Sequence, residues 1–304
     1  MELQQIRRAL MDGLLSFPVT DFDSTGSFDP EGYMARLKWF MSKDISAVFV
    51  AGGTGEFFSL TEDECRRIVE LAVPVAGGRM PVISSVGRSV SEAVTFARIA
   101  SDAGIDALLL MPPYLTECPA EGAVAYARAI MENTDLPVIY YNRSNGVLGA
   151  RHVEQLAAAC PNLIGLKDGT GNIQELNDII RTMGDRLVYI GGVPTAEIIS
   201  QAYLAIGVNT YSSAVFNFVP DLAVHFYRAL QVGNQEVVNL ILKEFFIPFV
   251  RLRGKKAGYA VSLIKAGARI AGRSAGDVRP PLVMPDDLET EILTGLIRQA
   301  AHLI

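Results

Sequence analysis

The decapeptide LIGLKDGTGN, residues 163–172, begins with a short apolar run that ends at the ammonium side chain of Lys167. Its first residues have the character of a buried strand, and Lys167 stands at the carboxyl end of that strand. Side chains alternate between the two faces of a strand, so if Lys167 points inward, Gly165 and Leu163 do as well. We therefore expect Gly165 to leave space beneath the lysine side chain.

Seven further apolar runs recur along the chain, separated by stretches with helical character. Most of the eight runs are uniformly apolar, which is typical of parallel strands that are covered on both faces. The alternation predicts an α/β fold, a (β/α)8 TIM barrel with additional C-terminal helices, and the alternative is an open doubly wound sheet. The eight runs occupy residues 13–20, 45–53, 80–87, 105–114, 136–142, 163–169, 187–192 and 207–213.

Helices are expected between these strands and after the last one. The segment SLTEDE offers Ser59 or Thr61 as an N-cap, followed by acidic residues that suit the positive end of the helix dipole. We expect the barrel, with a short amino-terminal helix, to occupy residues 1–235. A helical extension, residues 236–304, is expected to pack on the barrel, with a loop at 272–285. Helices between strands are expected at residues 61–75, 90–103, 120–133 and 195–205.

The composition excludes several classes of protein. The chain has 304 residues, 50% of them hydrophobic, with a formal net charge of −6 and a pI of about 5.2. Its basic residues are scattered, so neither nucleic acid nor an anionic membrane is expected as a partner. The amino terminus lacks the apolar core of a signal peptide, and the apolar runs are too short to span a bilayer, which takes about 18 or more apolar residues. A cytoplasmic location is therefore expected.

Cysteine and histidine residues are too dispersed to suggest a metal site or a disulfide framework. We expect the cysteines to be buried or half-buried thiols, and we expect neither a metal nor an organic cofactor. The residues concerned are Cys65, Cys118 and Cys160, and His152, His225 and His302.

The carboxyl ends of barrel strands carry the reactive groups in this fold, and Lys167 is the clearest candidate. An ammonium in a poorly hydrated barrel mouth has a lowered pKa, and the free amine is a nucleophile toward a carbonyl group. The alternative is a solvated lysine at a strand end. Tyr140 and Tyr141 face opposite sides, so only one can reach the mouth, where a phenol near Lys167 could transfer protons. The alternative for that tyrosine is a packing role in the core.

Two further groups of residues could bind a substrate. In the turn GGTGE, Gly53 and Gly55 can bring backbone N–H groups close to an anion, and Thr54 adds a hydroxyl. Gly191 and Gly192 could do the same after the seventh strand, while tight turns alone would also explain these glycines. The run TYSS, with Ser212 and Ser213, suits a hydroxylated or carboxylate ligand, although it could equally cap the next helix.

Taken in order, these segments resemble the dihydrodipicolinate synthase and N-acetylneuraminate lyase superfamily of Schiff-base enzymes. The similarity covers nearly the whole chain and rests on FPVTDFD, GGTGE, YYN and GLKDGTGN. It implies that Lys167 forms the Schiff base and that Tyr141 relays protons. It also implies that Thr54, with the backbone of Gly53 and Gly55, binds the carboxylate of a 2-oxo acid. Members of this superfamily are usually tetramers, so a homo-oligomer, a dimer or a tetramer, is expected.

Within that superfamily the segments GLLSFPVTDFD, YNRSN and YSSAVFNFVP are most similar to the decarboxylating dehydratases of glucarate catabolism. The similarity implies a lyase acting on a small-molecule sugar diacid, with Asn142 and Arg143 near the substrate. Arg143, Ser212 and Ser213 are candidates for its distal carboxylate or hydroxyls. The synthases have a tyrosine where this chain has Leu115 and an arginine where it has Gly146, which argues against synthase activity.

Two alternatives remain at the level of sequence. One is a class I pyruvate-dependent aldolase or synthase that acts on 2-oxo sugar acids through the same lysine. The other is a non-catalytic 2-oxo acid sensor on an inactive barrel, which the presence of both Lys167 and Tyr141 disfavours.

Overall fold

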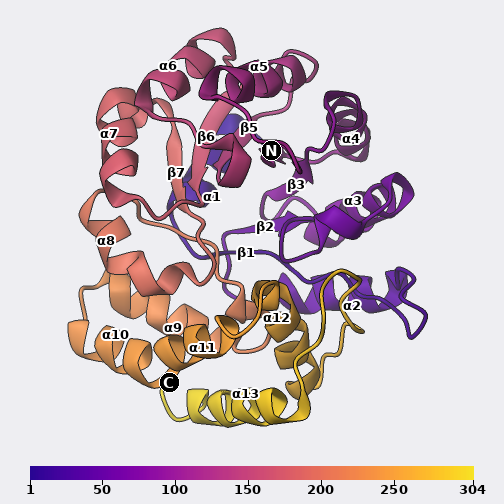
Figure 1. Ribbon diagram of the computed structural model, residues 1–304, viewed down its shortest axis with the longest axis vertical. Helices are drawn as coiled ribbons and strands as arrows, with labels where there is room; N and C mark the ends of the chain where they lie inside the picture. The colour runs from indigo at the N-terminus through magenta and orange to yellow at the C-terminus, as the bar shows by residue number, and fades with distance from the viewer.

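The computed structural model describes residues 1–304, with seven parallel strands at its centre (Figure 1). Each strand pairs with the next one in chain order, so β1 and β7 are the ends of the hydrogen-bonded series. Every residue in these strands is buried, as expected for parallel strands that helices cover. The strands are β1 (Leu15–Ser16), β2 (Ala47–Val50), β3 (Val82–Val86), β4 (Ala107–Leu110), β5 (Val138–Asn142), β6 (Leu163–Asp168) and β7 (Val188–Gly191).

The segment that follows β7 closes the sheet into a barrel. The backbone of Leu15 in β1 bonds to Tyr211 O at 3.2 Å and to Ser213 N at 2.9 Å. On the other side, Gly191 in β7 bonds to Thr210 O at 2.9 Å and to Ser212 N at 3.0 Å. The predicted barrel is thus confirmed and the open sheet is excluded. The expected eighth strand was wrong in extent, because residues 207–213 contribute only isolated bridges to both neighbours.

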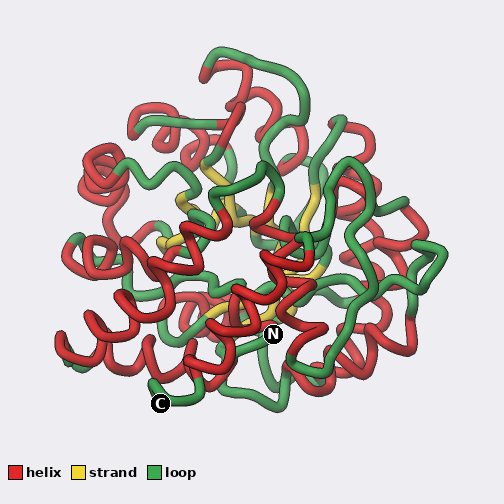
Figure 2. Tube along the Cα trace, turned by 60° about the horizontal axis from the view of Figure 1, so that its bottom comes forward, coloured by secondary structure: helices red, strands yellow, loops and turns green.

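Helices follow the strands and form an outer layer around them (Figure 2). The predicted cap of α3 is Thr61, whose side chain accepts from Glu64 N at 3.2 Å while the Glu64 carboxylate accepts from Thr61 N at 2.8 Å. The expected helix at 195–205 was too long, because Thr195 has a left-handed φ of 55° and a 3₁₀ turn precedes α8. The helices are α1 (Leu3–Met11), α2 (Pro30–Phe40), α3 (Glu62–Ala76), α4 (Val90–Ala103), α5 (Ala120–Met131), α6 (Ala150–Ala159), α7 (Ile173–Met183), α8 (Ser200–Ala205) and α9 (Pro220–Gln231).

Further helices at the carboxyl end of the chain lie beside α9 and α2, in the orange and yellow part of Figure 1. A π-helical segment, Leu242–Phe246, joins the first two of them. Residues 272–285 contain no helix or strand, as predicted. One cluster of buried apolar side chains includes Ile6 in α1, the barrel strands and Ala300 in the last helix. These helices are α10 (Gln235–Ile241), α11 (Ile247–Arg253), α12 (Tyr259–Ile270) and α13 (Asp287–Ala300).

None of the helices has both the length and the apolar character needed to cross a lipid bilayer. The cysteines are free thiols, of which Cys65 and Cys160 are buried and Cys118 is partly exposed, as the sequence predicted.

A buried ion pair connects the turn after β2 to the C-terminal helices. Lys265 Nζ in α12 lies 2.8 Å from Glu56 Oε1, and neither side chain has any exposed surface. The same amine donates to Asp277 O at 3.0 Å, and Glu56 Oε2 accepts from Arg279 N at 2.9 Å. Glu56 itself has a left-handed φ of 60°. The pair therefore holds the turn of residues 52–56 in an unfavourable backbone conformation and fixes it against α12.

Removing one member of this pair leaves the other charge buried without compensation. We predict that Lys265→Met lowers the free energy of unfolding by about 3–5 kcal/mol, the cost of breaking a buried pair. The double variant Glu56→Gln/Lys265→Met should lose much less, because no charge is stranded and the substituted amide can still accept from Arg279 N. Urea denaturation at one protein concentration measures both. Equal midpoints for the single variant and the unmodified protein would contradict this account.

Candidate active site

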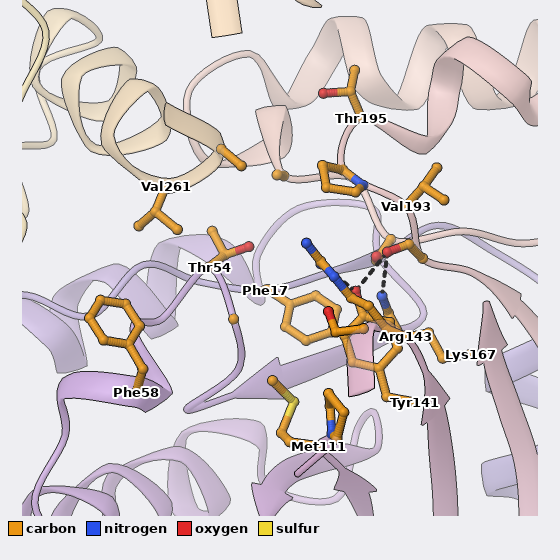
Figure 3. A pocket seen from close by; sticks show the side chains of 18 of the residues that line it. Phe17, Thr54, Phe58, Met111, Tyr141, Arg143, Lys167, Val193, Thr195 and Val261 are labelled. Carbon is orange, nitrogen blue, oxygen red and sulfur yellow. Dashed lines mark hydrogen bonds between the residues drawn. The ribbon is translucent and has the colours of Figure 1, made fainter. Parts of the chain in front are cut away.

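A cavity of about 660 Å³ opens at the carboxyl ends of the strands, where barrel enzymes carry their reactive groups. Its floor and walls come from residues at the ends of β5 and β6 and from the loops after the other strands, and α11 and α12 cover it. In Figure 3, Lys167, Tyr141 and Arg143 are grouped on one side of the cavity and Thr54 lies on the other. The volume lies within the range of sites for small molecules.

Lys167 lies inside the barrel mouth and is not the solvated strand-end lysine that was the alternative. Its side chain is buried, and Nζ donates to Gly192 O at 3.1 Å (Figure 3). Nζ also lies 4.0 Å from the centre of the Tyr141 ring and 5.3 Å from that of Phe17. The neighbouring carboxylate of Asp168 is directed elsewhere, accepting from Thr170 N at 2.9 Å and from Tyr203 Oη at 2.7 Å.

The surroundings of Lys167 favour its neutral amine. Burial lowers the pKa of Lys167, and the nearby Tyr141 phenol only partly opposes that shift. No carboxylate pairs with this amine, so no charge partner offsets the cost of burying an ammonium. A neutral amine can attack a carbonyl carbon to form an imine.

One glycine makes room for the lysine, and it is not the one that the sequence suggested. A Cβ at Gly192 would lie 2.3 Å from Lys167 Nζ, so only glycine lets the amine approach this carbonyl. A Cβ at Gly165 would lie 2.6 Å from Val188 Cγ2. The expected space beneath the lysine is thus occupied by a side chain of β7, and Gly165 serves close packing between neighbouring strands.

Tyr141 is the tyrosine of β5 that reaches the cavity, whereas Tyr140 faces outward and donates to Gly146 O at 2.6 Å. The Tyr141 hydroxyl donates to Gly192 O at 2.8 Å, the carbonyl that also accepts from Lys167. Arg143 Nη1 donates to the same phenol oxygen at 2.9 Å. Burial acts to raise the pKa of Tyr141, but the positive charges of Lys167 in its protonated form and of Arg143 outweigh it and bring the pKa below its usual value. This phenol is placed to exchange protons with a group bound to Lys167.

Of the three residues in the turn after β2 that were predicted to bind an anion, two line the cavity. Gly53 and Thr54 line the cavity. Gly55 does not line it, because it packs under the turn, where its carbonyl accepts from Thr20 Oγ1 at 2.6 Å. The structure thus leaves Gly53 and Thr54 as the exposed part of this turn.

Three other predicted substrate contacts do not line the cavity. Asn142 points away from the barrel interior, and its amide bonds the N–H and C=O of Leu148 at 2.7 and 3.1 Å. Gly191 packs against Tyr203, and Gly192 takes its place at the cavity. Ser213 is fully buried and donates to Glu197 Oε1 at 2.5 Å. Arg143 and Ser212 line the cavity as expected.

Sequence reasoning missed two kinds of lining residue. Phe17 follows β1 in the segment FPVT, where the alternation of side chains could have identified it. Arg253 comes from α11, and Val261 and Ile264 from α12. Nothing in the local pattern of those helices indicates which of their residues meet the barrel mouth.

The comparisons with known proteins agree on one family. A sequence model described as the dihydrodipicolinate synthetase family matches residues 10–300. A protein of Rhizobium meliloti (strain 1021), named "Probable 5-dehydro-4-deoxyglucarate dehydratase", is 49% identical over 297 residues, which cover 98% of each chain. A protein with the same name from Rhizobium rhizogenes (strain K84 / ATCC BAA-868) is 50% identical over 292 residues, covering 96% of this chain and 95% of that protein. The crystal structure of dihydrodipicolinate synthase from Bacillus clausii matches with a TM-score of 0.89 at 27% identity, over 96% of this chain and 98% of that one.

The position of the Tyr141 phenol predicts a part in proton transfer at Lys167. We expect Tyr141→Phe to slow imine formation with pyruvate by about 10²–10⁴-fold, the usual contribution of a general acid–base group. Borohydride trapping followed by mass spectrometry of the peptide that contains Lys167 measures the rate. Tyr189→Phe is the control, because this strand tyrosine donates to Gly184 O and does not line the cavity. Trapping by Tyr141→Phe as fast as by the control would leave Tyr141 with a packing role only.

Proposed function

This chain belongs to the dihydrodipicolinate synthetase family, and we propose that it is a lyase that converts 5-dehydro-4-deoxy-D-glucarate to 2,5-dioxopentanoate, water and CO2. The observation that carries the proposal is the buried amine of Lys167, which has no ionic partner and meets the cavity beside the Tyr141 phenol. Relatives that match nearly the whole chain bear the name of this activity.

The first step is the formation of a Schiff base on Lys167. The amine adds to the C5 ketone of the substrate, and the ketone oxygen leaves as water, so a C=N bond replaces the C=O bond. Protons must reach the departing oxygen, and the Tyr141 phenol lies beside the amine with Arg143 bonded to it. The protonated imine then makes the neighbouring C4–H acidic.

Elimination and decarboxylation both use this imine as the acceptor of electrons. Loss of a C4 proton gives an enamine, which expels the C3 hydroxyl as water and leaves a conjugated iminium ion. The C1–C2 bond then breaks, its electrons move through the conjugated chain to nitrogen, and CO2 departs. Protonation at carbon, conversion of the C2 enol to an aldehyde and hydrolysis of the imine release 2,5-dioxopentanoate. The water of hydrolysis balances the water lost in the first step, and Lys167 is regenerated.

The remaining lining groups can be assigned to parts of the substrate. We assign the carboxylate next to the ketone to Gly53 and Thr54, whose backbone and hydroxyl face the cavity. Ser212 is assigned to a substrate hydroxyl. Candidates for exchange of the C4 proton are Tyr141, Lys167 itself, a serine such as Ser212 and a carboxylate of the substrate.

Two positions favour elimination over condensation with a second aldehyde. Gly146 cannot carry a longer side chain, because a Cβ there would lie 2.9 Å from Tyr140 Oη and 3.1 Å from Pro112 Cβ. Leu115, near the mouth, is fully exposed and offers no side-chain hydrogen bond. Neither residue can hold the aldehyde partner that a condensation needs.

We also propose that the protein assembles as a homo-oligomer, a dimer or a tetramer, and that it works in the cytoplasm. Exposed apolar side chains such as Leu115, Val232 and Leu288 suit a contact between subunits. The three free thiols suit a reducing compartment. The net charge of −6 gives no support to nucleic acid or an anionic membrane as a partner.

The proposal is tested by the products formed from 5-dehydro-4-deoxy-D-glucarate. CO2, 2,5-dioxopentanoate and pyruvate should be followed separately, and we predict CO2 and 2,5-dioxopentanoate in equal amounts, with little pyruvate. Lys167→Met should form neither product, because it has no amine for the imine. Lys38→Met, at an exposed lysine of α2, should keep the full rate. Pyruvate release at a comparable or faster rate would replace this function with that of a pyruvate-dependent aldolase.

A further inference from the structure

Two arginines, Arg143 and Arg253, line the cavity in addition to Lys167. They come from distant parts of the chain, one from the loop after β5 and the other from the last turn of α11. Neither guanidinium forms an ion pair with a carboxylate of the chain. The cavity therefore has an excess of positive charge that the chain itself does not neutralise.

Arg253 is held in place by one nitrogen only. Its Nη1 donates to Pro194 O at 2.6 Å and to Thr195 Oγ1 at 2.5 Å, both in the loop after β7. Its Nη2 and Nε donate no hydrogen bond within the chain. A guanidinium fixed at one nitrogen keeps an edge free for bidentate bonds to a carboxylate, at little further cost in side-chain entropy. Arg143 differs, because its Nη1 bonds to the Tyr141 phenol.

The charged groups around Arg253 do not balance its positive charge, so a bound anion would stabilise it. Burial lowers the pKa of Arg253, Glu197 opposes that shift, and the positive Arg143 adds to it. Glu197 is a weak counter-charge, because burial raises its pKa to about 7 and its Oε1 already accepts from Ser213. An arginine remains charged in such surroundings. An anion bound beside it would relieve the repulsion from Arg143.

We propose that Arg253 binds the second carboxylate of the substrate, the one remote from the 2-oxo group, and so selects diacids over monoacids. This inference rests on the proposed function, in which Gly53 and Thr54 hold the first carboxylate and Lys167 binds the ketone carbon. Arg143 is thereby assigned to Tyr141 and to the proton chemistry, in contrast to the part in distal carboxylate binding considered from the sequence. Arg253 is a specificity-determining residue that no strand-end pattern indicated.

The reaction gives this assignment a kinetic signature. The second carboxylate departs as neutral CO2, so its bond to Arg253 is not strengthened as the transition state is reached. An interaction made in the ground state and not strengthened later lowers KM without raising kcat. Arg253→Met should therefore raise KM for 5-dehydro-4-deoxy-D-glucarate about 10- to 100-fold, the range of a charged hydrogen bond. Its kcat should stay within about threefold of that of the unmodified protein.

Two 2-oxo acids that form the imine but have no hydroxyl to eliminate test the assignment independently of turnover. 2-Oxoadipate has six carbons and a distal carboxylate, and 2-oxohexanoate differs only in having a methyl group there. Both should form an imine with Lys167 that borohydride traps, and half-maximal trapping concentrations can be compared. The unmodified protein should trap 2-oxoadipate at about 10- to 100-fold lower concentration than 2-oxohexanoate. Arg253→Met should remove that preference and leave trapping of 2-oxohexanoate unchanged.

Three further variants control the comparison. Arg251→Met alters an exposed arginine of the same helix and should behave as the unmodified protein. Arg253→Gln keeps a donor for Pro194 O and Thr195, so it provides a folded variant without the charge if Arg253→Met does not fold. Arg143→Met should weaken the trapping of both acids to a similar extent, because it disturbs Tyr141.

The outcomes separate this inference from the proposed function. Retention of the preference for 2-oxoadipate by both Arg253 variants would overturn it. An equal loss of trapping for the two acids would also overturn it, because Arg253 would then support the whole cavity rather than one end. If the unmodified protein forms no CO2 from 5-dehydro-4-deoxy-D-glucarate, the proposed function fails, while the two-acid comparison still reports on Arg253.

Discussion

The chemistry of this site depends on one constraint: the Lys167 amine is buried inside the barrel and has no anionic partner, so its protonated form is costly. The amine is buried against the Gly192 carbonyl and the faces of Tyr141 and Phe17, and these groups can accept a hydrogen bond or a weak cation–π contact but supply no negative charge. Burial without pairing favours the neutral amine, which is the reactive form. The closed barrel produces this situation, because alternation along β6 sends Lys167 inward and Asp168 to the opposite face.

The C-terminal helices complete the site that the barrel begins. Glu56 is the last residue of the turn that carries Gly53 and Thr54, and it pairs with Lys265 in α12. The preceding residue of that helix, Ile264, lines the cavity. The helix α11 adds Arg253, fixed by the loop after β7. Buried and partly buried polar contacts thus join α11 and α12 to the loops after β7 and β2, although these segments are more than 50 residues apart in sequence.

Local patterns predicted most of the fold and the reactive centre. Period-two alternation limited the cavity to one of Tyr140 and Tyr141, and the resemblance to the family selected Tyr141. With Tyr141 inside, the same alternation along β5 would also have directed Asn142 outward. It could not decide between Ser212 and Ser213, because that depends on the pairing of Ser212 with Leu15 across the closing edge. Strand and helix periodicity carries no information on contacts between distant segments. Such contacts determine the short extent of the eighth strand, the Glu56–Lys265 pair and the position of Arg253 at the cavity.

The central claim, that burial keeps the Lys167 amine neutral, is tested most directly by the pH dependence of imine formation with pyruvate. Only the free amine reacts, so the rate of borohydride-trapped labelling at Lys167 should rise with pH and level off above the pKa of that amine. Because burial lowers this pKa from the ordinary value of 10.5, the account predicts that the rate levels off below pH 10.5. A rate that continues to rise through pH 10.5, as for an exposed lysine, would contradict it.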